Sequence, residues 1–120
     1  MISPTDKGIR VDSEGDGHYG SSRGNRRHNG EDWLCDVGQQ IVAPFNMFIE
    51  RISYPNGDKI MSGIAWKSGR STGRMWYFEP YDYLIGANAF EGMPIGVAQN
   101  VSEYYGLPKM KNHIHLRVDK

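Results

Sequence analysis

This sequence has a single cysteine, no net charge and no long apolar run. The 120 residues include a single cysteine, Cys35, so no internal disulfide framework can form. Fourteen basic residues balance fourteen acidic ones, and a net charge of zero argues against a broad electrostatic grip on nucleic acid or anionic lipid. Apolar stretches extend over only a few residues, which excludes a transmembrane helix and predicts no membrane insertion.

The length is close to that of one ordinary domain. We expect a single domain over residues 1–120, in which residues 1–27 form an irregular N-terminal segment and residues 28–120 form the β core. The first residues, MISPTDKGIRVDSEGDG, have no apolar h-region and therefore predict no secretory signal peptide. Hydrophobic residues make up 38% of the chain, which is enough to fill a core at this length.

Short runs of β-branched and aromatic residues recur between turn residues. Their spacing predicts an antiparallel all-β domain, a small sheet or sandwich. Asn56-Gly57 predicts a hairpin turn over residues 55–58, because Asn-Gly readily takes a positive φ. One short helix is predicted over Val101–Tyr105, with Asn100 or Ser102 as its cap. The expected strands lie within residues 39–44, 46–55, 60–68, 73–80, 93–99 and 113–118.

Three of the four histidines fall in short patterns that suit a metal ion. His28 and Asp32 form a His-x-x-x-Asp pattern where the N-terminal loop meets a strand. His113 and His115 are two residues apart, so on a strand both imidazoles face the same side while Ile114 enters the core. The two patterns together offer His, Asp and His as ligands with one histidine left over to handle a proton, which is the donor set of a catalytic zinc site. Taken alone, a His-x-His strand is more often a plain surface strand.

The same residues resemble the lysostaphin-type zinc peptidases, which cut peptidoglycan cross-bridges. Residues 38–44, GQQIVAP, are similar to the family's strand after the aspartate, and residues 92–96, GMPIG, are similar to its turn before the last strands. Residues 113–118, HIHLRV, resemble the closing His-x-His strand. The nearest likeness is to the vertebrate leukocyte cell-derived chemotaxin branch, through Gly-x-Gly-x-Tyr at residues 15–19 and Leu-Cys at residues 34–35.

The resemblance implies a role for each matching residue. His28, Asp32 and His115 match the ligands of one zinc ion, and His113 matches the active-site histidine that hydrogen-bonds the attacking water or the oxyanion. The sequence departs from the family mid-chain, where Glu79 stands in place of a further active-site histidine and Pro80 in place of a leucine. A second departure, Met47 in place of a glycine, affects packing.

Glu79 is a second candidate catalytic residue, in addition to His113. On a regular strand Tyr77 and Glu79 share a face while Trp76 and Phe78 take the opposite, core-like face. A glutamate next to a zinc ion can act as a general base. The same alternation turns Cys35 away from Asp32, which predicts a small core residue.

These features predict a zinc-dependent endopeptidase that hydrolyses the peptide cross-links of peptidoglycan. We expect a groove that holds the zinc, lined by Tyr77, Tyr105 and Arg23, and action at the bacterial cell wall or periplasm. The lack of a leader would suit a phage-encoded lytic protein or a chain whose export segment was removed. The alternatives are a catalytically inactive, zinc-stabilised binding module and a structural component of a phage virion or secretion assembly; the sequence leaves the oligomeric state open.

Overall fold

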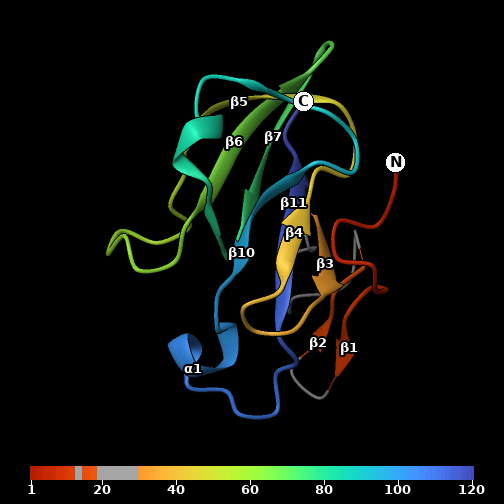
Figure 1. Ribbon diagram of the computed structural model, residues 1–120. Coiled ribbons are helices and arrows are strands. Elements are labelled where there is room, and N and C mark those ends of the chain that lie inside the picture. The colour runs from red at the N-terminus through yellow and green to blue at the C-terminus, as the bar shows by residue number, and fades with distance from the viewer. Residues whose placement is uncertain (13–14, 19–29) are drawn as a thin grey trace.

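The computed structural model describes residues 1–12, 15–18 and 30–120 of an antiparallel β protein (Figure 1). A six-stranded sheet has the order β3-β11-β7-β6-β5-β9, and a three-stranded sheet has the order β4-β10-β8. β1 and β2 form a separate two-stranded ribbon. The large sheet comprises β3 (Glu31–Leu34), β5 (Met47–Ile52), β6 (Gly63–Ser68), β7 (Ser71–Trp76), β9 (Asn88–Ala89) and β11 (His113–Val118). The other strands are β1 (Val11–Asp12), β2 (Gly15–Asp16), β4 (Gln40–Val42), β8 (Phe78–Pro80) and β10 (Pro94–Ala98).

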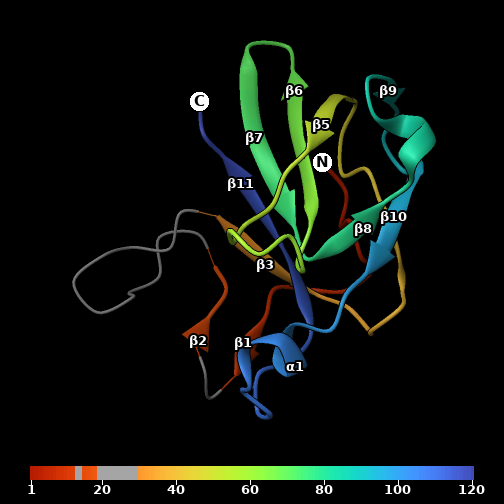
Figure 2. The same cartoon turned by 90° about the vertical axis from the view of Figure 1, so that its left-hand side faces the viewer.

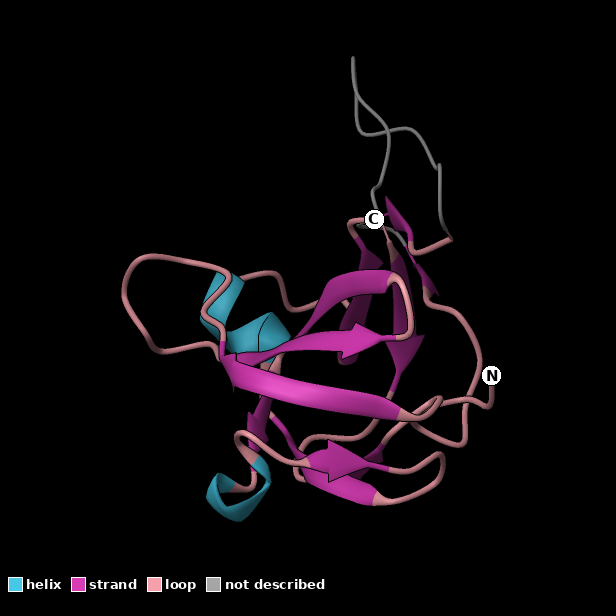
Figure 3. Cartoon of the chain, turned by 90° about the horizontal axis from the view of Figure 1, so that it is seen from above, coloured by secondary structure: helices cyan, strands magenta, loops and turns pink. Residues whose placement is uncertain are grey.

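The core lies where one face of the large sheet meets the three-stranded sheet. Figure 2 shows β8 and β10 on one side of the molecule, beside β5, β6, β7 and β11 of the large sheet. Seen from above, strands dominate the described chain and the helical segments are short (Figure 3). Both sheets contribute fully buried side chains to one cluster, which includes Ile41, Ile49, Ile64, Trp66, Met75, Phe78, Ile95 and Ile114. The prediction of a small, all-β antiparallel domain is confirmed.

The strand and helix predictions succeeded where a regular sequence pattern continues without a break. β11 covers the predicted residues 113–118, and α1 covers Val101–Tyr105 as predicted. The side chain of Asn100 accepts a hydrogen bond from the Glu103 backbone N–H, which is the geometry of an N-cap. Among the described residues no helix is long and apolar enough to span a membrane. Cys35 is buried in the core, as strand alternation predicted.

The N-terminal residues cover the outer edge of the large sheet along β3. Ile9 bridges Trp33, the Leu34 N–H donates to the Gly8 carbonyl, and the Arg10 N–H donates to the Asp32 carbonyl at 2.7 Å. The Asp32 N–H in turn donates to the carbonyl of Gly17 at 2.8 Å. An edge strand covered in this way presents fewer unpaired backbone groups to other chains. The same contacts bring Arg10 against the side chain of Asp32.

The predicted tight turn at residues 55–58 is wrong in its detail. β5 and β6 do pair as an antiparallel hairpin, but residues 53–62 connect them as a wide loop. The positive φ in this loop is at Lys59 (61°) rather than at Asn56 or Gly57. The two-residue hairpin turn is at Gly69-Arg70, between the paired residues Ser68 and Ser71, where Gly69 has a φ of 58°.

The single strand predicted over residues 73–80 is also wrong, because the chain breaks at Tyr77. Tyr77 has a φ of 80°, a region that a non-glycine residue enters only at a cost. β7 ends at Trp76 in the large sheet, and β8 begins at Phe78 in the three-stranded sheet. The period-2 alternation that placed Tyr77 and Glu79 on one face therefore does not hold across this break.

Gly63 tests how tightly β6 packs against β7. A Cβ atom at this position would lie 1.9 Å from the Met75 carbonyl oxygen, whereas one at Gly57 would have no heavy atom within 4 Å. Gly63→Ala should lower the free energy of unfolding by about 1–3 kcal/mol, the usual cost of overpacking. Urea denaturation should show little change for the control Gly57→Ala. Equal stability of the two variants would contradict the close backbone contact.

Cys35 gives a chemical test of the core. Burial raises the pKa of its thiol to about 12, with the charge of Asp36 adding to the effect. A raised thiol pKa keeps the reactive thiolate scarce below that pH, so Cys35 should resist a disulfide-exchange reagent at pH 8 in the native protein. The same thiol should react rapidly in urea. Fast reaction of the native protein would show that the core around Cys35 is open.

Candidate metal centre

Asp32, His113 and His115 meet on the face of the large sheet that points away from the core. The register pairs His115 with Asp32 across β11 and β3, and His113 with Leu34. Nδ1 of His115 lies 2.8 Å from Oδ1 of Asp32, and Nε2 of His113 lies 3.8 Å from Oδ2 of the same carboxylate. Ile114, between the histidines, is fully buried in the core. The prediction that both imidazoles face one place is therefore confirmed.

This cluster is shielded from solvent. The exposed fractions are 4% for Asp32, 3% for His113 and 6% for His115. A carboxylate buried this deeply is unfavourable unless it is paired and hydrogen-bonded. Asp32 is paired on more than one side, which accounts for its stable burial.

Arg10 supplies the cation that the buried carboxylate requires. Its Nη2 and Nε atoms lie 3.0 and 3.3 Å from Oδ2 of Asp32. Its Nη1 atom bonds both oxygens of Asp12, at 3.0 and 3.1 Å. Asp12 is itself anchored, because its Oδ2 accepts from the Lys111 backbone N–H at 2.8 Å. A buried chain of Asp12, Arg10 and Asp32 thus reaches His115.

The proton on His113 has a defined position. Nδ1 of His113 lies 2.9 Å from the Lys111 carbonyl oxygen, and a carbonyl can only accept, so Nδ1 is the donor. In the neutral ring Nε2 then carries a lone pair on the side of Asp32. Burial lowers the pKa of His113, although the Asp32 carboxylate opposes this change. The neutral, proton-accepting ring is therefore the form favoured at neutral pH.

Aromatic side chains border the two histidines. The Trp76 indole stacks on the His115 imidazole with ring centroids 5.7 Å apart, and the Arg117 guanidinium lies 4.7 Å from the Trp76 ring centroid. The Tyr77 ring meets His113 edge-on at 5.5 Å, and its hydroxyl lies 3.0 Å from that of Tyr105. Trp76 is thus on the site face, not on the core-like face that regular alternation predicted.

Tyr77 carries a neutral phenol whose ring packs against His113. Burial raises the pKa of its phenol, and the hydrogen bond to Tyr105 and the charge of Asp32 raise it further. Tyr105 belongs to α1, and its hydroxyl also lies 3.3 Å from the Asn56 side-chain nitrogen in the loop 53–62. The predicted groove residues Tyr77 and Tyr105 are therefore in contact, whereas Arg23 lies outside the described residues.

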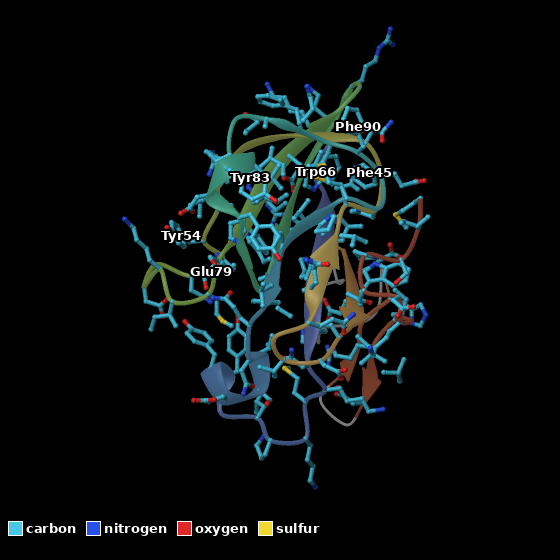
Figure 4. All side chains as sticks on the ribbon, viewed as in Figure 1. Phe45, Tyr54, Trp66, Glu79, Tyr83 and Phe90 are labelled. Carbon is cyan, nitrogen blue, oxygen red and sulfur yellow. The ribbon has the colours of Figure 1, made fainter. Side chains whose placement is uncertain are left out.

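Glu79 has different surroundings. It is exposed on β8, where its backbone pairs with Val97 of the three-stranded sheet. Its side chain borders a surface pocket of about 290 Å³, and the residues that line this pocket include neither Asp32 nor a histidine. Figure 4 shows Glu79 close to Tyr54, which also lines the pocket. The alternation argument that aimed Glu79 at the metal is wrong, and its catalytic role stays a prediction.

The described residues supply two of the three predicted zinc ligands. Within residues 1–12, 15–18 and 30–120, no group of three or more His, Cys, Asp or Glu side chains is arranged to hold a metal ion. His28, the third predicted ligand, falls outside these residues. Oδ1 of Asp32 and Nδ1 of His115 are 2.8 Å apart and hydrogen-bonded to each other, and a carboxylate oxygen and an imidazole nitrogen are both donor types that zinc takes. The two donors present therefore match zinc in their chemical type.

Two glycines allow the backbone to close around this pair of donors. A Cβ atom at Gly30 would lie 2.8 Å from Nε2 of His115, and one at Gly17 would lie 2.6 Å from the Asp32 Cβ atom. Any larger residue at either position would displace a predicted ligand. Close backbone approach is one of the main uses of glycine at functional sites.

Sequence reasoning missed Arg10 as a residue of this site. A lone arginine near an N-terminus is usually solvated, and no short motif links it to Asp32. The signal that could have identified it is the alternation of Ile9, Arg10 and Val11, which predicts a short extended segment with Arg10 on one face. Its partner strand could not be read from that pattern.

Comparison with known proteins finds distant similarity to leukocyte cell-derived chemotaxin-2. Leukocyte cell-derived chemotaxin-2 of Bos taurus is 29% identical over 107 residues, which cover 88% of this chain and 68% of that protein. The Mus musculus protein of the same name gives the same identity and coverage. No protein-family model matches the chain. The likeness to the chemotaxin branch is thus supported at a low level of identity, and the wider lysostaphin-type assignment stays a prediction.

Proposed function

We propose that this chain binds one zinc ion through His28, Asp32 and His115 and uses it to hydrolyse peptide bonds in the cross-bridges of peptidoglycan. The observation that carries the proposal is the 2.8 Å approach of Asp32 Oδ1 to His115 Nδ1, with His113 Nε2 at 3.8 Å from the other carboxylate oxygen. Asp32 and His115 offer a carboxylate and one imidazole of the two-histidine, one-carboxylate donor set of a hydrolytic zinc site, and His113 lies beside them without being a ligand. The peptidoglycan substrate rests on the resemblance to lysostaphin-type peptidases.

When bound, zinc supplies an activated water at neutral pH and polarises a carbonyl oxygen. His113 holds the proton in this scheme, because its Nδ1–H is already directed to the Lys111 carbonyl and its Nε2 can accept. The Tyr77 ring packs edge-on against His113, and its hydroxyl, held neutral by burial, is hydrogen-bonded to that of Tyr105. We assign no proton-transfer role to Glu79.

A second candidate function is a zinc-stabilised binding module without catalysis. Two observations favour it: the family's mid-chain histidine is absent, and Glu79 borders a pocket apart from the histidines. The similar proteins are also named as chemotaxins. Such a module would hold a wall fragment or a protein partner; a structural component of a phage virion or secretion assembly is the other non-catalytic alternative for the same fold. The binding module would have the same zinc site as the peptidase but would not cleave a substrate.

The zinc content of two histidine variants tests which histidine is a ligand and which only accepts a proton. His115→Ala should lose the metal, because it removes one of three donors, whereas His113→Ala should keep about one equivalent of zinc per chain. Metal analysis after dialysis against a weak chelator measures both. A full equivalent of zinc in His115→Ala would overturn the ligand assignment.

Turnover decides between the two functions. The zinc-loaded protein should release peptides from purified sacculi of at least one cross-bridge chemistry, detected by mass spectrometry, and His113→Ala should lower the rate by about 10²–10⁴-fold. Release by neither protein, with zinc bound, would leave the binding module as the function.

Glu79→Gln tests the remaining catalytic assignment. Because Glu79 lies on the three-stranded sheet and borders a separate pocket, we expect the variant to retain its zinc and to cleave within about threefold of the wild-type rate. The measurement is the initial rate of peptide release. A loss of about 10²-fold or more, the usual value of a positioned base, would return Glu79 to the active site and refute its exclusion.

A further inference from the structure

We infer that Arg10 is a positioning residue for the metal centre: it holds Oδ2 of Asp32 so that Oδ1 alone is presented beside His115. This inference rests on the proposed zinc site but not on hydrolysis. It would apply equally to an enzyme and to a zinc-stabilised binding module.

The geometry divides the two oxygens of the Asp32 carboxylate between different partners. Oδ2 receives two nitrogen atoms of the Arg10 guanidinium, at 3.0 and 3.3 Å. Oδ1 lies 2.8 Å from Nδ1 of His115. A planar guanidinium that binds through two nitrogens fixes the orientation of its partner better than a point charge does. The carboxylate is thereby held in the orientation that a single-oxygen ligand needs.

Arg10 is itself held rigidly. The side chains of Arg10, Asp12 and Asp32 are only 3%, 3% and 5% exposed, and Arg10 forms an ion pair with each carboxylate. Nη1 of Arg10 bonds both Asp12 oxygens, and Asp12 accepts from the Lys111 N–H. The Arg10 backbone is tied to Asp32 and to Gly17. Partners outside the ligand shell that are fixed in this way typically contribute 10- to 100-fold to metal affinity.

The sign of the effect separates positioning from simple charge. A cation near the site repels zinc, so an Arg10 that acted through charge alone would weaken zinc binding, and its removal would tighten it. An Arg10 that orients Asp32 has the opposite consequence. The informative variant therefore removes the guanidinium without changing the net charge of the site.

Arg10→Gln combined with Asp12→Asn meets this requirement, because it removes one charge of each sign. The matched control is Lys67→Gln with Glu50→Gln, which removes an ion pair of 3.8 Å between β6 and β5. Zinc dissociation constants are measured by competition with a chromophoric chelator. Cobalt(II) absorption spectra report the coordination geometry, and thermal unfolding of the metal-free proteins reports stability.

We expect the Arg10/Asp12 variant to bind zinc about 10- to 100-fold more weakly than the wild type, with an altered cobalt spectrum, and the control to remain within about twofold. Zinc affinity within twofold of the wild type, or tighter, in a folded variant would overturn the inference. If the double variant does not fold, Arg10→Lys decides: it keeps the charge without the planar fork, so weaker zinc binding supports positioning and unchanged binding refutes it.

These outcomes distinguish the inference from the proposed function. If the wild type and the Arg10/Asp12 variant bind zinc equally well and the wild type cleaves its substrate, only the positioning role of Arg10 is refuted. A clear loss of zinc affinity without any wild-type cleavage would refute the peptidase alone. A wild-type chain that binds no zinc would refute both.

Discussion

The buried carboxylate of Asp32 is the group on which the site depends. A charge in this position is unfavourable without compensation, and the chain provides it from two directions. β11 brings His113 and His115 to one side of the carboxylate, while the N-terminal segment along β3 brings Arg10 to the other. The backbone hydrogen bonds that cover the sheet edge also place the Arg10 guanidinium, which compensates the charge of Asp32, so the fold of the N-terminal segment and the chemistry of the site are linked.

Local sequence patterns were sufficient where structure repeats with a simple period. The His-x-His pattern on a strand placed His113 and His115 on one face and Ile114 in the core, because successive side chains on a strand alternate. The helix after Asn100 was predictable because capping is a local interaction. These predictions needed no knowledge of which strands pair.

The sequence could not reveal features that depend on distant partners. Arg10 is a site residue only because residues 8–10 lie along β3, some twenty residues further on. In the loop 53–62 the positive φ is at Lys59 and not at Asn56 or Gly57. The loop makes distant contacts, such as the hydrogen bond from the Tyr104 hydroxyl to the Asp58 carboxylate. Such contacts arise from tertiary packing, and no period in the local sequence records them.

The break at Tyr77 has consequences for both sheets. A non-glycine residue in this conformation costs about 1–3 kcal/mol and persists only where its surroundings fix it. Here the Tyr77 N–H donates to Ser62 and the Tyr77 carbonyl accepts from Gln99, at 2.7 and 2.9 Å. The strain turns the Tyr77 ring onto His113 and moves Phe78 and Glu79 into the other sheet. In this chain the mid-chain residues that contact the histidines are therefore Trp76, which stacks on His115, and Tyr77, whose ring meets His113.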